Sequence, residues 1–128
     1  MELRPCTAAV IVSPDTFDVG DSCACAPVSF DVTNDTGGPL DGHRLTLALP
    51  APMKTRSVSL VYGGGAAGIT TASAVDVVVA TWPDGGVVSV ACEICPGCEP
   101  IGTYVGTVDV GTPAGIAVAS VPVTINRA

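Results

Sequence analysis

Cysteine is the residue type in this chain best able to do chemistry, because thiols form disulfide bonds, bind metals and act as nucleophiles. The chain has 128 residues and six cysteines. They fall into three groups: Cys6 alone, Cys23 and Cys25 in "CAC", and Cys92, Cys95 and Cys98 in "CEICPGC". Six is an even number, so up to three disulfide bonds are possible, with fifteen pairings that spacing alone does not separate.

Disulfide bonds are the first chemistry that this spacing predicts. Cys23 and Cys25 are separated by one residue, so in an extended chain their side chains point the same way and do not bond to each other. We expect each of them to reach the 92–98 segment or Cys6. One bridge from this pair to the 92–98 segment would close a long loop and contribute roughly 4 kcal/mol to stability under the chain-entropy model.

A zinc site is the alternative chemistry. The sequence "CPGC" has the C-x-x-C spacing of tetrahedral zinc centres, although the other half of the site would be the less usual C-x-C. Four ligands would come from one set of cysteines: Cys23, Cys25, Cys92, Cys95 and Cys98. Iron–sulfur ligation lacks the fourth thiol expected soon after Cys98, and haem attachment lacks a histidine after C-x-x-C. We therefore expect no cofactor, with zinc as the alternative.

The sequence gives little support to catalysis. His43 is the only histidine, and no Gly-x-Ser-x-Gly elbow supplies a nucleophile for it. A Cys–His pair is disfavoured because the cysteines are crowded together. The pattern places His43 at the start of a strand beside a turn, so we expect a partly exposed structural residue and no enzyme.

Two further polar motifs are explained by turn chemistry. Asp15, Asp18 and Asp21 recur every third residue, whereas an EF-hand needs acidic residues at alternate positions and a closing glutamate. The 34–36 segment "NDT" is an N-glycosylation sequon, but it lies in a Gly-rich turn where asparagine is favoured anyway. We expect neither calcium binding nor a glycan.

Apolar and polar residues alternate along most of the chain, which is typical of half-buried strands. Turn sequences such as "PDGG" at 83–86 separate the runs, and no window has helical spacing. Eight segments carry the pattern: 8–12, 28–32, 44–49, 58–62, 75–82, 88–92, 104–110 and 121–125. They predict an all-β fold, an immunoglobulin-like antiparallel β-sandwich of about 7–8 strands, in a single domain covering residues 1–128.

Composition limits the partners. The chain has five basic and twelve acidic residues, a net charge of −7 and no basic cluster, so we expect no nucleic acid and no membrane as partner. The longest apolar stretch, 74–82, is far short of the ~20 residues of a membrane span. Charged residues make up only 13%, which suits a surface covered by other protein.

The run "VSFDVTNDTGGPLDGHRLTLALP" at 28–50 resembles immunoglobulin-like repeat domains of prokaryotic surface proteins. In those domains a strand ending in "TN" leads through a Gly-rich turn to a strand ending in "LP". The residues that match are Thr33, Asn34, Gly37, Gly38, Leu49 and Pro50. Later segments extend the resemblance to about residue 90. It implies structural or adhesive work and supplies no catalytic residue. In composition the chain is also similar to small decoration proteins of phage capsids.

The cellular compartment in which disulfide bonds can form decides between these two resemblances. Disulfide bonds need an oxidising environment, yet the N-terminal sequence shows no cleavage site for export. A protein assembled in the cytosol and oxidised after lysis satisfies both conditions. We therefore expect a non-catalytic phage capsid decoration or cement protein, located in the virion, that binds and stabilises the coat lattice as a homo-oligomer, for example a trimer. The alternatives are an extracellular or cell-surface adhesive or filament-forming immunoglobulin-like module, and a small zinc-binding protein.

Two regions are expected to make contacts with a partner. The small-residue segment 63–74 reads as a long loop, and loops of that length are often functional. The last strand, Ala117 to Asn126, contains Pro122, which marks a sheet edge because proline cannot donate a backbone hydrogen bond.

Overall fold

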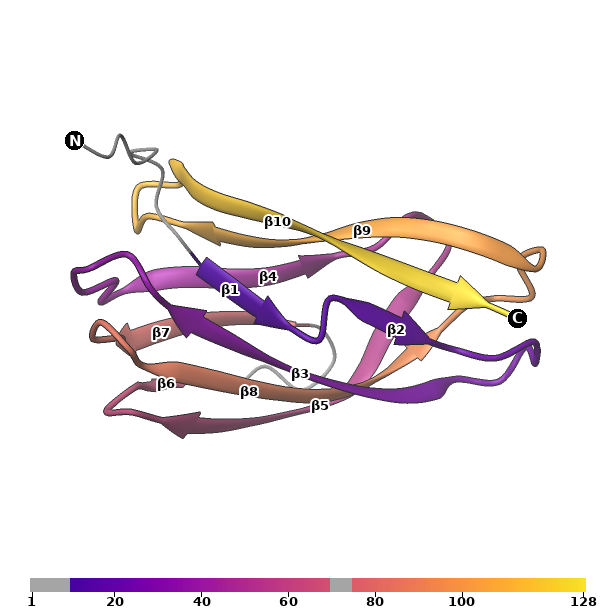
Figure 1. Ribbon diagram of the computed structural model, residues 1–128, viewed down its shortest axis with the longest axis horizontal. Helices are drawn as coiled ribbons and strands as arrows, with labels where there is room; N and C mark the ends of the chain where they lie inside the picture. The colour runs from indigo at the N-terminus through magenta and orange to yellow at the C-terminus, as the bar shows by residue number, and fades with distance from the viewer. Residues whose placement is uncertain (1–9, 70–74) are drawn as a thin grey trace, which may run out of the picture.

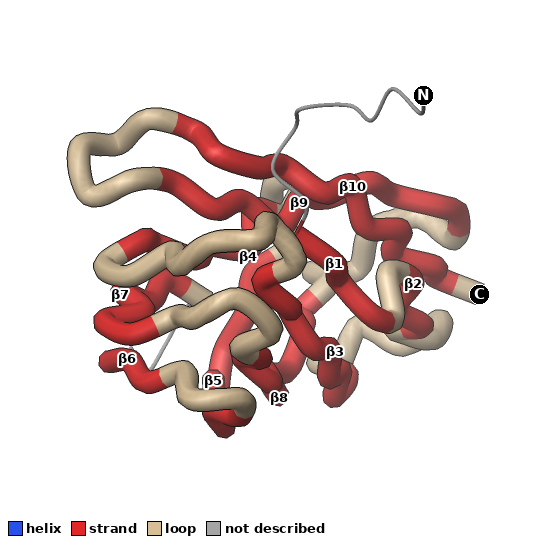
Figure 2. Tube along the Cα trace, turned by 60° about the vertical axis from the view of Figure 1, so that its left-hand side comes forward, coloured by secondary structure: helices blue, strands red, loops and turns tan. Residues whose placement is uncertain are grey.

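The computed structural model describes residues 10–69 and 75–128. Within these ranges the chain forms ten β-strands and no helix, and the strands make two sheets that pack face to face (Figures 1 and 2). A helix of the length and apolar character needed to cross a membrane is therefore absent from the described part of the chain. The all-β sandwich predicted from the alternating pattern is confirmed.

The smaller sheet has four strands in the order β1-β3-β8-β5, and every neighbouring pair in it is antiparallel. Its strands are β1 (Val10–Ser13), β3 (Ala26–Asn34), β8 (Val87–Cys95) and β5 (Lys54–Gly63). The short β1 covers only the end of β3, and β5 forms the opposite edge.

The larger sheet has six strands in the order β2-β10-β9-β4-β7-β6. Its strands are β2 (Thr16–Asp18), β10 (Ala117–Arg127), β9 (Gly102–Gly111), β4 (His43–Ala48), β7 (Asp76–Thr81) and β6 (Ala67–Ile69). The pairing of β2 with β10 is parallel, and the other pairs are antiparallel. The predicted antiparallel sandwich thus contains one parallel pair, at this edge.

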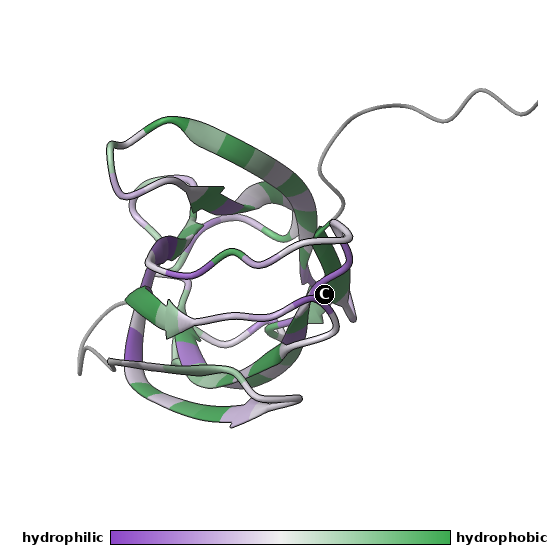
Figure 3. Ribbon diagram, turned by 90° about the vertical axis from the view of Figure 1, so that its left-hand side faces the viewer, coloured by the Kyte–Doolittle hydropathy of each residue, from purple (hydrophilic) through white to green (hydrophobic). Residues whose placement is uncertain are grey.

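The core fills the space between the two sheets. Along β8 and β9 the buried residues occupy every second position, so each strand has one face in the core and one outside. Figure 3 shows the same alternation as bands of hydrophobic and hydrophilic residues along the strands. Each fully buried large side chain contributes roughly 1.5–3 kcal/mol. The largest of them are Trp82, Phe30, Leu45, Ile94 and Ile125.

All eight predicted segments overlap strands of the structure, although the first extends to residues outside the described part. The two strands that the pattern missed, β2 and β6, have three residues each, too few to show alternation. Because the predicted loop at 63–74 contains β6, that prediction is wrong for Ala67–Ile69; residues 70–74 lie outside the description. A side chain at Gly68 would meet the carbonyl oxygen of Val78 at 2.8 Å, so the close pairing of β6 with β7 requires glycine there.

Candidate interaction site

Two disulfide bonds tie one end of the sandwich together. Cys23 is bonded to Cys98 and Cys25 to Cys95, with Cα–Cα distances of 4.4 and 4.0 Å. The second bond continues the ladder between β3 and β8, in which Ala26 stands opposite Ile94. The bonds span 75 and 70 residues of sequence, so each closes a long loop. The predicted link between the two cysteine groups is present, and it is doubled.

Cys92 takes no part in these bonds. It lies three positions before Cys95 on β8, so its side chain points to the other face of the strand, into the core. It is buried and carries a free thiol, and burial, aided by the nearby charge of Glu93, raises the pKa of that thiol to about 11. The prediction of Cys92 as a disulfide candidate is therefore wrong. Cys6, the remaining candidate, lies outside the described residues.

In this oxidised form of the protein, most of the cysteines proposed as zinc ligands cannot bind a metal. Four of the five, Cys23, Cys25, Cys95 and Cys98, are consumed by disulfide bonds and have no thiolate to offer. Among residues 10–69 and 75–128, no three His, Cys, Asp or Glu side chains are grouped as metal ligands.

Arg127, at the end of β10, is a structural residue of this end that the sequence did not point to. Its side chain is 3% exposed, although a charged group is rarely buried without a carboxylate. Its Nη1 donates to the carbonyl oxygens of Gly20 at 3.2 Å and Ser22 at 2.8 Å, while Nε and Nη2 donate to that of Glu99 at 2.8 and 2.7 Å. One guanidinium group thus joins the two loops that the disulfide bonds also join.

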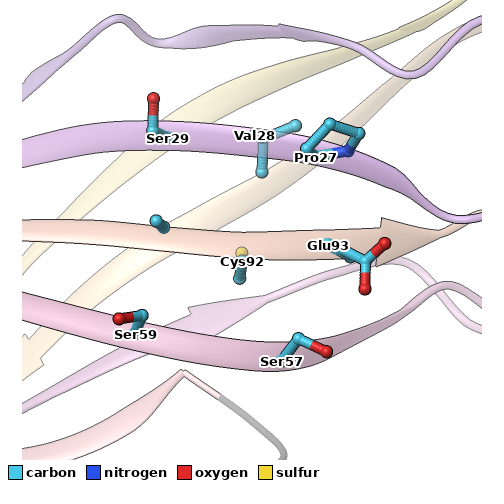
Figure 4. A pocket seen from close by; sticks show the side chains of 8 residues that line it. Pro27, Val28, Ser29, Ser57, Ser59, Cys92 and Glu93 are labelled. Atoms are coloured by element: carbon cyan, nitrogen blue, oxygen red, sulfur yellow. The ribbon is translucent and has the colours of Figure 1, made fainter.

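A shallow groove crosses the outer face of the four-stranded sheet near the disulfide bonds. Its volume is about 440 Å³. Figure 4 shows its lining, with Ser29 on β3, Glu93 on β8, and Ser57 and Ser59 on β5. The register explains the hollow, because the small Ala91 of β8 lies in one row between Ser29 and Ser59. Within the described residues the three serine hydroxyls make no hydrogen bonds to protein, so they are available to a ligand.

Strand β5 is irregular where it borders this groove. Its register against β8 shifts between Arg56 and Ser59, which is a β-bulge. Ser57, in the bulge, has a φ of 56°, in the left-handed region that non-glycine residues seldom occupy. Nε of Arg56 donates to the Glu93 carboxylate at 3.1 Å. Ser57 of the bulge and Glu93 of this exposed ion pair both line the groove.

The opposite end of the sandwich is held by Asn34, which is fully buried. Its Nδ2 donates to the carbonyl oxygens of Gly38, Trp82 and Pro83 at 2.8, 3.1 and 3.2 Å, and its Oδ1 accepts from the backbone and the hydroxyl of Thr36. The side chain of the sequon therefore joins the β3–β4 loop to the β7–β8 loop. In the folded protein it has no room for a glycan, which agrees with the expectation of an unused sequon.

The other candidate residues from the sequence lie apart. His43 begins β4 and is half-buried, and its Nδ1 lies 3.1 Å from the carbonyl oxygen of Asp41, so its predicted structural role fits. Asp18 accepts a hydrogen bond from Asn126 across the β2–β10 pair, and Asp15 accepts through its backbone from Thr124. Asp18 is the last residue of β2, whereas Asp15 and Asp21 lie in the loops on either side of it, so the turn interpretation is wrong for Asp18.

Pro122 lies where β10 has a free side. On that side β2 pairs only with residues Thr124 to Asn126, whereas β9 pairs with β10 over most of its length. The predicted sheet edge is therefore present in the N-terminal half of β10.

Comparisons with known proteins identify the fold alone. No protein-family model and no curated protein matches the sequence. A non-cellulosomal cohesin from the archaeon Archaeoglobus fulgidus aligns with a TM-score of 0.52 and 12% identity over 95% of this chain and 91% of that one. The PapD-like domain 7 of human CEP192 aligns with a TM-score of 0.50 and 8% identity, over 99% of this chain and 90% of that one. AggA, the major subunit of aggregative adherence fimbriae type I from Escherichia coli, aligns with a TM-score of 0.43 and 14% identity over 94% of each chain. The chain has a β-sandwich fold similar to that of the cohesin and PapD-like domains.

Proposed function

We propose that this protein is an exported, non-catalytic β-sandwich module that binds another protein on the outer side of its four-stranded sheet. The observation that carries the proposal is the pair of disulfide bonds, Cys23–Cys98 and Cys25–Cys95. Such bonds form and persist in oxidising environments and are rare in the cytosol. Two such bonds at one end of a small domain favour a location outside the cell or in its envelope.

The chemistry of the described residues favours binding over catalysis. The Cys92 thiol is buried and has a raised pKa, so it is a poor nucleophile. His43 contacts a backbone carbonyl oxygen, and no hydroxyl or thiol within residues 10–69 and 75–128 is hydrogen-bonded to it. The groove is shallow and lined by hydroxyls, a small methyl group and one exposed ion pair, which suits a contact surface more than a water-free reaction site.

The phage capsid decoration protein expected from composition is the rival function. It also requires a rigid β-sandwich, a sparsely charged surface and late oxidation, and it adds a partner, the assembled coat. Export accounts for both disulfide bonds without requiring release by lysis, and for that reason we prefer it.

The two functions differ in where and when the disulfide bonds form. Cells of the producing organism are treated with an alkylating agent before lysis and then fractionated. The exported module is expected in the envelope or medium, already oxidised, with intact mass lowered by ~4 Da for two bonds. A reduced chain in the cytosol would overturn export. A chain that sediments with virus particles would replace it with the decoration function.

Intact mass also tests the zinc alternative. A bound zinc ion adds ~65 Da under native conditions and is lost on unfolding, whereas disulfide bonds persist until a reductant is added. We expect the oxidised mass without metal. A chain purified with one equivalent of zinc and free thiols at Cys23, Cys25, Cys95 and Cys98 would contradict the disulfide assignment.

A further inference from the structure

Among the described strands, β5 forms an edge of the four-stranded sheet. It pairs with β8 on one side, and no other described strand pairs with it on the other. At ten residues it is much longer than the edge strands β1, β2 and β6, which have three or four. Short edges are one way in which proteins prevent unwanted strand pairing, and β5 lacks that protection.

The two halves of β5 differ in the other kinds of protection. The first half carries Lys54, Arg56 and the bulge at Ser57, which are devices that discourage strand addition. The second half, 59–63, has regular register and reads "SLVYG", without charge or proline. Val61 in this half is 68% exposed. By contrast, the free half of β10 is protected by Pro122 and by a register shift between Ala117 and Ala119.

The charges near this edge indicate what kind of segment fits it. Arg44 and Arg56 are paired with Asp76 and Glu93, and Arg127 is buried against carbonyl oxygens. Lys54 is exposed and makes no ion pair, which sets it apart from the other lysine and arginine residues in the described part of the chain. An acidic protein with net charge −7 thus presents an unpaired cation at the start of its open edge.

We propose that β5 is the docking edge of this module, where an extended segment of a partner protein adds an antiparallel strand along 59–63 and places carboxylates beside Lys54. This inference rests on the proposed binding function and names its partner class. Main-chain hydrogen bonds to the open edge would supply affinity. The antiparallel direction puts the C-terminal end of the segment at the N-terminal end of β5, so its acidic residues follow its apolar ones.

The probe is a fluorescein-labelled synthetic peptide of alternating threonine and valine that ends in glutamates and a C-terminal amide. A second peptide has its glutamates at the N-terminal end, and a third has lysines in their place. Fluorescence anisotropy gives the affinities of the oxidised full-length chain for each. Amide hydrogen exchange shows which strand the peptide protects. We expect saturable binding of the first peptide, weaker binding of the other two, and new protection within 59–63.

Two variants test the contribution of the β5 edge and that of the Lys54 charge separately. Val61→Lys adds a charge to the second half of β5, 59–63, and should lower the affinity for every peptide. Val105→Lys is the control, because this valine on β9 is 61% exposed but lies away from the edge, and it should not lower the affinity. Lys54→Glu should invert the preference between acidic and basic peptides, with a change of about two- to fivefold for each peptide, as exposed ion pairs provide. Circular dichroism and thermal unfolding confirm that each variant is folded.

Absence of saturable binding, protection of another strand, or a preference for acidic peptides that survives Lys54→Glu would each overturn the docking edge. None of these results would affect the export and oxidation of the proposed module, because both are measured in cells without any peptide. Conversely, a reduced cytosolic chain would remove the proposed function even if the peptide bound.

Discussion

Asn34 and Trp82 lie 48 residues apart in sequence and are both fully buried, and the Asn34 side chain donates a hydrogen bond to the Trp82 carbonyl oxygen at 3.1 Å. The indole of Trp82 in turn donates to the carbonyl oxygen of Gly86 at 2.9 Å. These bonds hold the β3–β4 and β7–β8 loops, each of which connects the two sheets, in one arrangement. The residue that looks like a sugar acceptor in the sequence is a structural link.

Replacing Asn34 with alanine is therefore expected to cost about 3 kcal/mol of unfolding free energy, because several buried carbonyl oxygens lose their donor at once. Chemical denaturation measures the loss. Asp35→Ala is the matched control, since Asp35 is the exposed neighbour and should change stability by less than about 0.5 kcal/mol. Equal stability of the two variants would contradict the role assigned to Asn34.

The burial of Asn34 also predicts whether this residue is glycosylated when eukaryotic cells secrete the protein. A glycan attached to Asn34 before folding would occupy the site of its hydrogen bonds, so glycosylated chains should fail to fold. We expect the folded protein secreted by eukaryotic cells to carry no glycan at Asn34, and any glycosylated fraction to be retained in the cell. Treatment with a glycosidase, followed by mass measurement of the secreted chain, checks this. A monomeric, cooperatively unfolding, glycosylated form would show that the prediction is wrong.

The sequence was sufficient for the longer strands but only partly for the site. Alternation located β3, β8 and β9 because each of these strands has one wet and one dry face over nine or ten residues. The same alternation could have excluded Cys92 from the disulfide bonds, since its distance of three from Cys95 places the two side chains on opposite faces.

Arg127 and β6 could not be inferred in this way. The role of Arg127 depends on three carbonyl oxygens of two loops far away in sequence, and no pattern of residue types records where carbonyl groups point. Strand β6 exists because its neighbour β7 offers a free edge, and its own three residues have little strand character. Both features are consequences of tertiary structure.

The raised pKa of Cys92 predicts a pH dependence of stability. In the folded protein this thiol keeps its proton up to about pH 11, whereas in the unfolded chain it ionises near 9. The unfolded state alone gains a charge between these values, so the stability contributed by the neutral buried thiol is present below pH 9 and is lost as the pH rises towards 11. Denaturation of the wild type and of Cys92→Ala across this range isolates the effect, because the other titrating groups are common to both.

In that comparison the difference in unfolding free energy between the two proteins should be constant below pH 9 and should shift against the wild type above it. Alkylation gives a second measure, since native Cys92 should react far more slowly with iodoacetamide at pH 8 than the thiol of a denatured chain does. Rapid labelling of native Cys92 would show that the thiol is accessible and would contradict its assigned burial.

Substitution of Arg127 tests whether the disulfide-linked end is also held without its covalent bonds. Arg127→Met keeps most of the length and apolar contact of the side chain but removes four hydrogen bonds, so three loop carbonyl groups lose their donor. We expect a loss of about 3 kcal/mol, and faster hydrogen exchange in the loops around Gly20 and Glu99. Arg44→Met removes an exposed ion pair with Asp76 and should change stability far less than Arg127→Met does.

The reduced protein makes this test sharper. With both disulfide bonds opened by a reductant, the guanidinium group still joins the two loops in the wild type, so the variant should lose more of its loop protection than the wild type does. Because its partners are carbonyl oxygens and not carboxylates, the contribution of Arg127 should change little between low and high salt. A strong salt dependence, or equal exchange in the reduced wild type and variant, would show that the disulfide bonds alone organise this end of the sandwich.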